Sequence, residues 1–322
     1  MMDWTDRHCR YFHRLIAPSV TLYTEMVTTG ALLFGDAERF LRYDQREHPV
    51  ILQLGGSNPA DLAIAAKMGE DAGYKEINLN CGCPSDRVQS GMFGACLMNT
   101  PDIVAECVAA MRAAVSIPVT IKTRIGIDDS EEYNFVHKFV DTVSNPQKSL
   151  KENAKTNCDI FVIHARKAWL KGLSPKENRE IPPLRYDIAQ NLKEDFPHLN
   201  IQINGGVKTI EDVATHLETF DGVMIGREAY QNPWFLRKIE TDILKTPNLL
   251  DVETILDEMV EYAKQQNKDY DTPLKSITRH MTGLFQGIPG ARQWRQILST
   301  EMHAPDTNPE NLKAAHTKAF GT

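Results

Sequence analysis

Two short stretches of sequence decide the fold: PVTIKTR at residues 118–124 and IFVIHAR at residues 160–166. Each is a run of β-branched and aromatic residues, which is typical of a buried strand, and each ends in basic residues. The first stretch follows residues 102–115, whose apolar side chains have helical spacing. The same alternation of strand and helix patterns extends to about residue 245 and predicts a parallel sheet in an α/β fold.

Seven strands are predicted in this part of the chain. A barrel and an open doubly wound sheet both satisfy the alternation, but polar residues at several strand ends favour a TIM (β/α)8 barrel, whose substrates bind at the carboxyl ends of the strands. Such a barrel needs an eighth strand, and because residues 7–15 have a helical pattern, we expect the missing strand to precede Met1. The predicted strands cover residues 21–27, 50–54, 76–80, 118–124, 160–165, 201–204 and 222–225, and a further helix covers residues 59–72.

Strand patterns stop after about residue 245. Helical spacing at residues 251–264, 273–285 and 290–298 predicts a small all-α domain. We therefore expect a catalytic barrel at residues 1–245 and a helical domain at residues 246–322. The polar segment 145–157 is predicted to be an exposed loop.

The composition excludes several classes of protein. Lys and Arg number 36 against 43 Asp and Glu, and the formal net charge of −7 argues against nucleic-acid binding through bulk positive charge. The chain has neither a signal-peptide pattern nor an apolar stretch of about 18 residues, so we expect a cytoplasmic protein without a membrane partner. The six cysteines lack the spacing of a disulfide framework or a zinc site, so free thiols and no bound metal are expected. No obligate protein partner is predicted.

The most informative motif is EINLNCGCP at residues 76–84. Gly82 and Pro84 predict a turn that presents the thiol of Cys83 at the rim of the barrel. A free thiol has a pKa of about 8.5 and is mostly protonated at neutral pH, so Cys83 is a candidate general acid. The alternative is a turn cysteine without a catalytic role.

Polar residues at four other strand ends suggest a ligand that carries negative charge. Lys122 suits a group that gains negative charge, such as the pyrimidine end of a reduced flavin, although a strand-end lysine can also simply reach water. His164 ends the next strand. Asn204-Gly205-Gly206 and Gly226-Arg227 follow the last two strands, where barrels commonly bind phosphate. No G-x-G-x-x-G motif follows a strand, which argues against a Rossmann-style dinucleotide site.

Two basic clusters stand out against the acidic total. Residues 164–185 contain six Lys and Arg and two acids, and two pairs with helical spacing, Lys275 with Arg279 and Arg292 with Arg295, lie in the predicted helical domain. Either cluster alone is typical of a solvated surface. Two clusters that flank one barrel mouth suit a polyanion such as RNA.

With these motifs, the chain resembles the tRNA-dihydrouridine synthases, most closely their bacterial DusA type. The resemblance implies an FMN-bearing TIM barrel with a C-terminal helical tRNA-binding domain. It also implies reduction of the C5–C6 double bond of a D-loop uridine, U20 or U20a, with electrons from NADPH. The motifs that carry it are residues 3–11 (DWTDRHCRY), 22–30 (LYTEMVTTG), 53–56 (QLGG), 76–84, 122–126 (KTRIG), 164–169 (HARKAW), 173–179 (LSPKENR) and 287–295 (GIPGARQWR).

The resemblance also implies roles for individual residues. Cys83 would give a proton to uracil C5, while reduced FMN delivers hydride to C6. Residues that hold FMN would be Met1, Gln53, Lys122, His164, Asn204, Gly205, Gly206, Gly226 and Arg227, and residues that contact tRNA would be Asn80, Lys176, Arg179, Arg292 and Arg295.

Two departures from the family pattern concern the N-terminus and one cysteine. Family members have a first strand that ends in Ala-Pro-Met, of which only Met1 has a match here, so we expect the sequence to begin late. Cys81 stands where relatives often have an aliphatic residue. Two other readings stay open: an FMN-dependent barrel reductase of a small pyrimidine-like substrate, and a flavin-free tRNA-binding scaffold.

Overall fold

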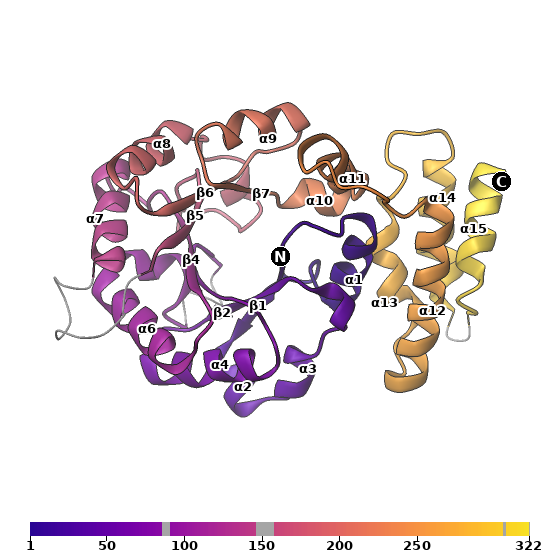
Figure 1. The fold of residues 1–322 in the computed structure, drawn as a ribbon, viewed down its shortest axis with the longest axis horizontal. Helices are drawn as coiled ribbons and strands as arrows, with labels where there is room; N and C mark the ends of the chain where they lie inside the picture. Colours follow the sequence, from indigo (N-terminus) through magenta and orange to yellow (C-terminus); the bar gives the residue numbers. More distant parts are fainter. Residues whose placement is uncertain (86–90, 146–157, 305–306, 322) are drawn as a thin grey trace. The chain divides into compact units, whose positions relative to one another are not determined.

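The computed structural model describes residues 1–85, 91–145, 158–304 and 307–321. All seven predicted strands are confirmed, and they form one sheet in the order β1 to β7, with parallel pairing from β2 through β7. Figure 1 shows this sheet curling inside a layer of helices, so the TIM-like α/β architecture is confirmed. The strands are β1 Leu22–Thr28, β2 Val50–Gly55, β3 Ile77–Cys81, β4 Val119–Arg124, β5 Ile160–His164, β6 Asn200–Asn204 and β7 Gly222–Met224.

Helices connect the strands, and the two predicted at residues 59–72 and 102–115 are confirmed as α4 and α6. Asn58 caps α4 by accepting hydrogen bonds from two backbone N–H groups of its first turn, and Pro59 occupies a first-turn position that needs no donor. The predicted loop at 145–157 lies, from residue 146 on, outside the described residues. The connecting helices are α2 Thr29–Phe34, α3 Ala37–Leu41, α4 Pro59–Asp71, α6 Pro101–Ala114, α7 Glu132–Ser144, α8 Tyr186–Asp195 and α9 Ile210–Leu217, with short 3-10 turns at Gln45–Glu47, Gly94–Asn99 and Glu177–Arg179.

The outer face of the sheet is apolar and packs closely on the helices. A Cβ atom at Gly69 of α4 would lie 2.6 Å from Leu52 and 2.8 Å from Ile77, so only glycine allows this approach of α4 to β2 and β3. Side chains alternate along a strand, so Gln53 and Asn78, which directly follow Leu52 and Ile77, point to the inner face. The inner face of β2 and β3 therefore carries buried polar groups.

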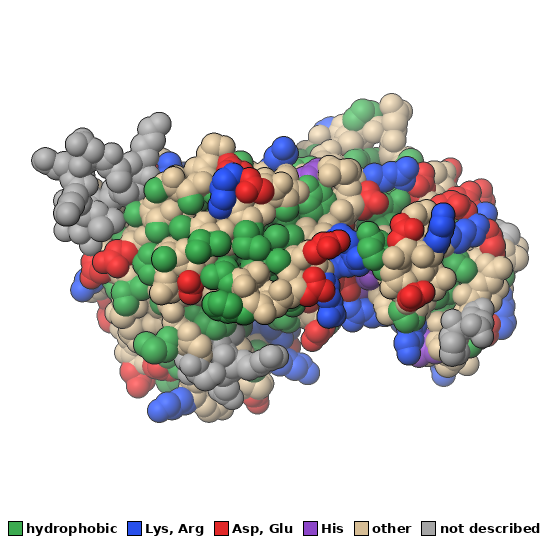
Figure 2. Space-filling model, turned by 90° about the horizontal axis from the view of Figure 1, so that it is seen from below, with side chains coloured by type: hydrophobic (Ala, Val, Ile, Leu, Met, Phe, Trp, Pro, Cys, Tyr) green, Lys and Arg blue, Asp and Glu red, His purple; other side chains and the backbone are tan. Residues whose placement is uncertain are grey.

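One surface of the helical layer remains apolar. α2, α3 and α4 lie along the lower edge of the view in Figure 1, and Figure 2, which looks at this side, shows hydrophobic side chains gathered there. In α2, Leu32 is buried, whereas Phe34 is 85% exposed; Phe40 and Ile64 are exposed on α3 and α4. These short helices therefore bury only one side of their apolar surface.

The chain divides by contacts into two compact units. One comprises residues Tyr23–Arg42 and Pro49–Ile225, and the other comprises Met1–Leu22, Tyr43–His48 and Gly226–Thr322. The second unit joins α1 to the C-terminal helices, so its limits differ from the predicted boundary at residue 245. Assignment of catalysis to residues 1–245 and of tRNA binding to residues 246–322 stays a prediction.

The second unit is helical, and its predicted helices are confirmed. Residues 7–15, 251–264 and 290–298 lie in α1, α12 and α14, and residues 273–285 include α13 and a 3-10 turn. None of the described helices is both long and apolar enough to cross a membrane. Its elements are α1 Arg7–Ile16, α10 Arg227–Gln231, α11 Trp234–Lys238, a π turn at Ile239–Ile243, α12 Val252–Tyr270, α13 Leu274–Thr278, a 3-10 turn at Arg279–Met281, α14 Ala291–Thr300, a 3-10 turn at Glu301–His303 and α15 Asn311–Phe320.

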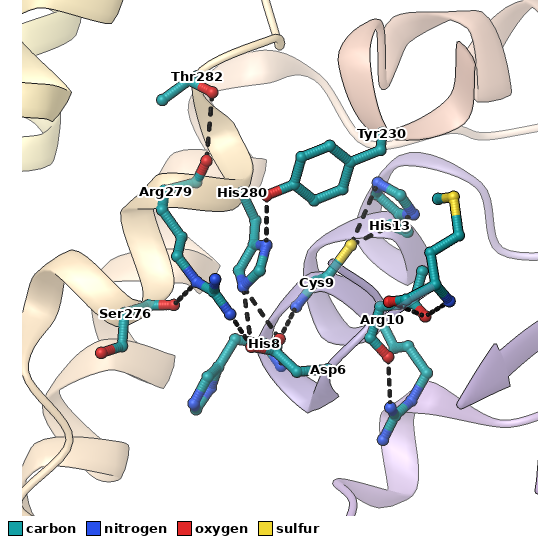
Figure 3. Close-up of polar contacts among 12 residues, drawn as sticks. Asp6, His8, Cys9, Arg10, His13, Tyr230, Ser276, Arg279, His280 and Thr282 are labelled. Carbon is teal, nitrogen blue, oxygen red and sulfur yellow. Dashed lines mark hydrogen bonds and ion pairs between the residues drawn. The ribbon is translucent and has the colours of Figure 1, made fainter. Parts of the chain in front are cut away.

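Asp6 is the centre of a partly buried polar cluster in this unit (Figure 3). Its carboxylate caps α1 and accepts hydrogen bonds from Arg279 Nη2 at 2.6 Å and His280 Nε2 at 3.1 Å. Burial acts to raise the pKa of Asp6, but the hydrogen bond and charge of His280 outweigh it and hold the pKa well below its usual range. The cluster thus ties the N-terminal helix to the turn after α13 within this unit.

Candidate active site

The turn after β3 holds Cys83 in a defined position. Asn80 Oδ1 accepts hydrogen bonds from the backbone N–H groups of Gly82 at 3.1 Å and Cys83 at 3.0 Å, and the carbonyl of Cys83 accepts one from Ala95 N–H at 2.9 Å. The Cys83 thiol is partly exposed, whereas Cys81 is fully buried, and burial raises the pKa of Cys81 well above its usual value. Of the two thiols in this motif, only Cys83 is available to a substrate.

A row of buried amides lies on the inner face beneath this turn. Asn80 Nδ2 donates to Gln53 Oε1, and Gln53 Nε2 donates to Asn78 Oδ1, both at 2.9 Å. Asn78 Nδ2 then donates to Thr120 Oγ1 at 2.8 Å. The predicted FMN residue Gln53 and the predicted tRNA residue Asn80 are therefore direct partners.

Lys122 lies on the neighbouring strand and faces an uncharged partner. Its Nζ donates to Asn204 Oδ1 at 3.0 Å, and Asn204 Nδ2 donates to the carbonyl of Met224 at 2.8 Å. Burial, followed by the charge of Arg124, lowers the pKa of Lys122 to about 8. A partly buried cation whose partner is an amide suits an anionic ligand.

The register of the strands brings His164 into the same group. His164 pairs with Arg124 across β4 and with Asn204 across β6. Burial, together with the charges of Arg124, Lys122 and neighbouring arginines, holds the pKa of His164 well below its usual value. Its imidazole is therefore neutral at physiological pH and offers one donor and one acceptor nitrogen.

Two glycines bring the backbone close to His164. Gly205 and Gly206 have φ values of +111° and +76°, which favour glycine. A Cβ atom at Gly205 would lie 2.6 Å from His164 Cδ2, and one at Gly206 would lie 2.7 Å from Tyr186 Oη. The close approach of these side chains, together with the positive φ values, leaves room only for glycine at both positions.

Arg124 connects the Cys83 turn to the segment that carries Lys176 and Arg179. The guanidinium is 3% exposed and donates through Nε to the carbonyl of Gly82 at 2.9 Å. Its Nη1 donates to the carbonyls of Lys167 at 2.9 Å and Asn178 at 3.0 Å. Asn178 is fully buried and lies in the 3-10 turn that ends at Arg179, and Lys176 immediately precedes this turn.

The remaining predicted site residues belong to the other compact unit. Gly226 and Arg227 lie at the start of α10, and a Cβ atom at Gly226 would lie 3.9 Å from Met1 Sδ. Arg292 and Arg295 are exposed on α14. Cys83, Lys122, His164 and Asn204 to Gly206 are thus brought together within one unit, and Met1, Gly226 and Arg227 within the other.

The sequence analysis missed the inner residues of this site. Asn78 and Thr120 are completely buried, and Arg124 was considered only as a strand-end cation. The available signal was the alternation of polar with apolar residues along INLN and VTIK, which marks a polar inner face. Within the described part of the chain, no group of three or more His, Cys, Asp or Glu side chains is placed to hold a metal ion.

The donors at this edge of the sheet fit FMN. Lys122 and neutral His164 can face a polar ring that gains negative charge, and the glycine turn after β6 has the positive φ values at which backbone N–H groups can face a phosphate. Gln53 adds a buried amide on the same inner face. The donor set therefore suits a flavin mononucleotide better than a divalent cation, which prefers carboxylates.

Comparison with known proteins identifies the family of this chain. The family model described as Dihydrouridine synthase (Dus) matches residues 1–320. A tRNA-dihydrouridine(20/20a) synthase of Vibrio cholerae is 57% identical over 320 residues, covering 99% of this chain and 94% of the relative. The enzymes of the same name from Escherichia coli K12 and Salmonella typhimurium are also 57% identical, covering 94% and 98% of this chain and 85% and 92% of theirs. The chain therefore belongs to the dihydrouridine synthase family.

Proposed function

We propose that this protein reduces uridine to 5,6-dihydrouridine in the D-loop of tRNA, at position 20 or 20a, with FMN as cofactor and NADPH as electron donor. The observation that carries the proposal is the partly exposed Cys83 thiol, held at the same edge of the sheet as Lys122, His164 and Asn204. Relatives with the matching name cover nearly the whole chain.

The residues proposed to bind FMN are those that the resemblance to the family assigns to it. Gln53, Lys122, His164 and the backbone at 204–206 offer donors to the ring and the phosphate, and Met1, Gly226 and Arg227 would complete the binding set. When bound, FMN supplies the hydride that uracil C6 receives, after reduction by NADPH. Lys122, protonated below a pH of about 8, stabilises negative charge next to it.

Cys83 would donate the proton to uracil C5. Its thiol is the partly exposed sulfur on the turn, and hydrogen bonds to Asn80 hold the backbone of the turn that carries it. A general acid must lie within hydrogen-bond distance of the atom it protonates. The uridine must leave its stack to reach this turn, which costs a few kcal/mol and is easiest in a loop.

Basic side chains would bind the tRNA backbone. Lys176 and Arg179 lie in one unit and Arg292 and Arg295 in the other, and all four can neutralise phosphates. Asn80 has both amide ends engaged, but a second Nδ2 hydrogen remains for a tRNA contact.

The first test is the colour of the flavin in the purified protein under anaerobic conditions. We expect NADPH to bleach it, and unmodified tRNA, but not free uridine, to restore it.

Cys83→Ala should bleach normally but recover its colour at least about 100-fold more slowly, since general acids contribute 10² to 10⁴ in rate. Cys96→Ala, which removes another partly exposed thiol, is the matched control. Recovery with free uridine would favour a small-molecule reductase, and a colourless protein would favour the tRNA-binding scaffold.

A further inference from the structure

A continuous chain of five side chains runs along the inner face of the sheet and ends at the Cys83 turn. It begins at Glu76, just before β3. Its links, from the turn inward, are Asn80 to Gln53 at 2.9 Å, Gln53 to Asn78 at 2.9 Å, Asn78 to Thr120 at 2.8 Å, and Thr120 Oγ1 to Glu76 Oε1 at 2.7 Å.

Every hydrogen bond in this chain points the same way. An ionised carboxylate only accepts, so Glu76 obliges the hydroxyl of Thr120 to donate to it. That leaves the oxygen of Thr120 to accept from Asn78 Nδ2, which turns Asn78 Oδ1 toward Gln53. The same logic fixes the orientation of each amide up to the turn.

The orientation of the last amide, Asn80, determines whether an oxygen or an NH₂ group faces the backbone of the turn. Asn80 presents its oxygen to the N–H groups of Gly82 and Cys83, at 3.1 and 3.0 Å. A flipped Asn80 would present an NH₂ group, which cannot accept them, and the turn would move. Asn78 and Thr120 are fully buried, and Gln53 and Asn80 nearly so, so water does not compete for the bonds among these four side chains. Glu76 is partly exposed.

We propose that Glu76, acting through Thr120, Asn78, Gln53 and Asn80, is a positioning residue that sets the direction of this chain and thereby holds the Cys83 thiol in its reactive position. The inference rests on the proposed function of Cys83 as the proton donor. Glu76 touches neither the turn nor the thiol and acts only through the orientation of the amides.

The decisive variant is Glu76→Gln, which keeps the shape of the side chain but removes its fixed polarity. An amide at position 76 can donate or accept, so the Thr120 hydroxyl and the amides above it are free to reverse. We expect kcat for tRNA reduction to fall on the order of 10- to 100-fold, as misplaced reacting groups do, with KM for tRNA and flavin content unchanged. Burial raises the pKa of Glu76 while the Thr120 hydrogen bond opposes the shift, so the assays are run at pH 8, on the alkaline side, where ionisation of the carboxyl is favoured.

A second substitution should restore the native direction of the hydrogen bonds in this chain. In the double variant Glu76→Gln with Asn78→Asp, the new amide donates to Thr120, Thr120 donates to the new carboxylate, and that carboxylate accepts from Gln53. The upper half of the chain then keeps its native orientation, and kcat should recover to within about threefold of wild type. Thr120→Val interrupts the same chain and should match the single variant.

Alkylation of Cys83 gives a readout that needs neither NADPH nor tRNA. The rate of Cys83 modification by iodoacetamide, followed peptide by peptide with Cys96 as internal reference, should change several-fold in Glu76→Gln and return in the double variant. Glu70→Gln, which alters a partly buried carboxylate on α4 that binds Ser116, is the matched control.

Wild-type kcat and a wild-type alkylation rate in Glu76→Gln would overturn the proposal, and so would a double variant as slow as the single one. Failure of the Cys83 proposal is distinguished because Cys83→Ala would then turn over normally.

Discussion

At the scale of the residue, Lys122 is the group whose charge the fold controls most directly. Burial and Arg124 lower its pKa to about 8, so it is a cation below that pH and loses its charge above it. We expect the affinity of the apo-protein for FMN to weaken by up to tenfold per pH unit above 8, because binding then requires uptake of a proton. Lys122→Arg stays charged throughout this range and should lack this decline. Quenching of flavin fluorescence between pH 6.5 and 9.5 measures the FMN affinity of the wild type and of Lys122→Arg. Parallel curves of affinity against pH for the two proteins would contradict the prediction.

Some residues of this site could be predicted from the sequence and others could not. Parallel strands align their carboxyl ends, so the proximity of Lys122, His164 and Asn204 followed from strand assignment alone. Asn78 and Thr120 were missed because their partners are set by the register between strands, which a single sequence does not reveal. The same holds for Arg124, whose acceptors are backbone carbonyls rather than recognisable side chains.

At the scale of the element, strands were easier to predict than some helices. Short β-branched runs located all seven strands, whereas α7, at Glu132–Ser144, was not predicted. Its aromatic and β-branched residues are weak helix formers, and the helix depends on burying Val136, Phe139, Val140 and Val143 against the sheet side of the unit. Tertiary packing therefore determines this helix more than local propensity does.

The link between the Cys83 turn and the segment 167–179 depends on Arg124. Arg124→Lys keeps the charge but loses the fork that donates to the carbonyls of Gly82, Lys167 and Asn178. Leaving buried carbonyls unpaired costs about 1–3 kcal/mol each, so we expect the free energy of unfolding to fall by about 2 kcal/mol. Trypsin should also cleave faster after Lys176 and Arg179. The control is Arg185→Lys, which alters a surface ion pair with Asp187 and should change the free energy of unfolding by less than about 1 kcal/mol. Equal losses of stability in the two variants would contradict the prediction.

At the scale of the whole molecule, an acidic protein is proposed to bind a polyanion. With a formal net charge of −7, the chain as a whole repels tRNA, so affinity must come from local cations that displace counterions from phosphates. Lys176 with Arg179 and Arg292 with Arg295 are the two pairs proposed for this role, one in each compact unit. The affinity of the protein for tRNA should therefore fall steeply with salt concentration despite the acidic composition.

Removing either pair should flatten this salt dependence rather than only weaken binding. For Lys176→Gln with Arg179→Gln, and likewise for Arg292→Gln with Arg295→Gln, we expect the slope of log affinity against log salt to become shallower by about 2, one unit for each lost phosphate contact. Titration of unmodified tRNA between about 50 and 200 mM salt measures the slope. Lys264→Gln with Lys313→Gln removes the same charge from lysines already paired with Glu310 and Asp257, so the slope should stay as in wild type. If all three double variants share one slope, net charge rather than these clusters governs tRNA binding, and the assignment of the four residues fails.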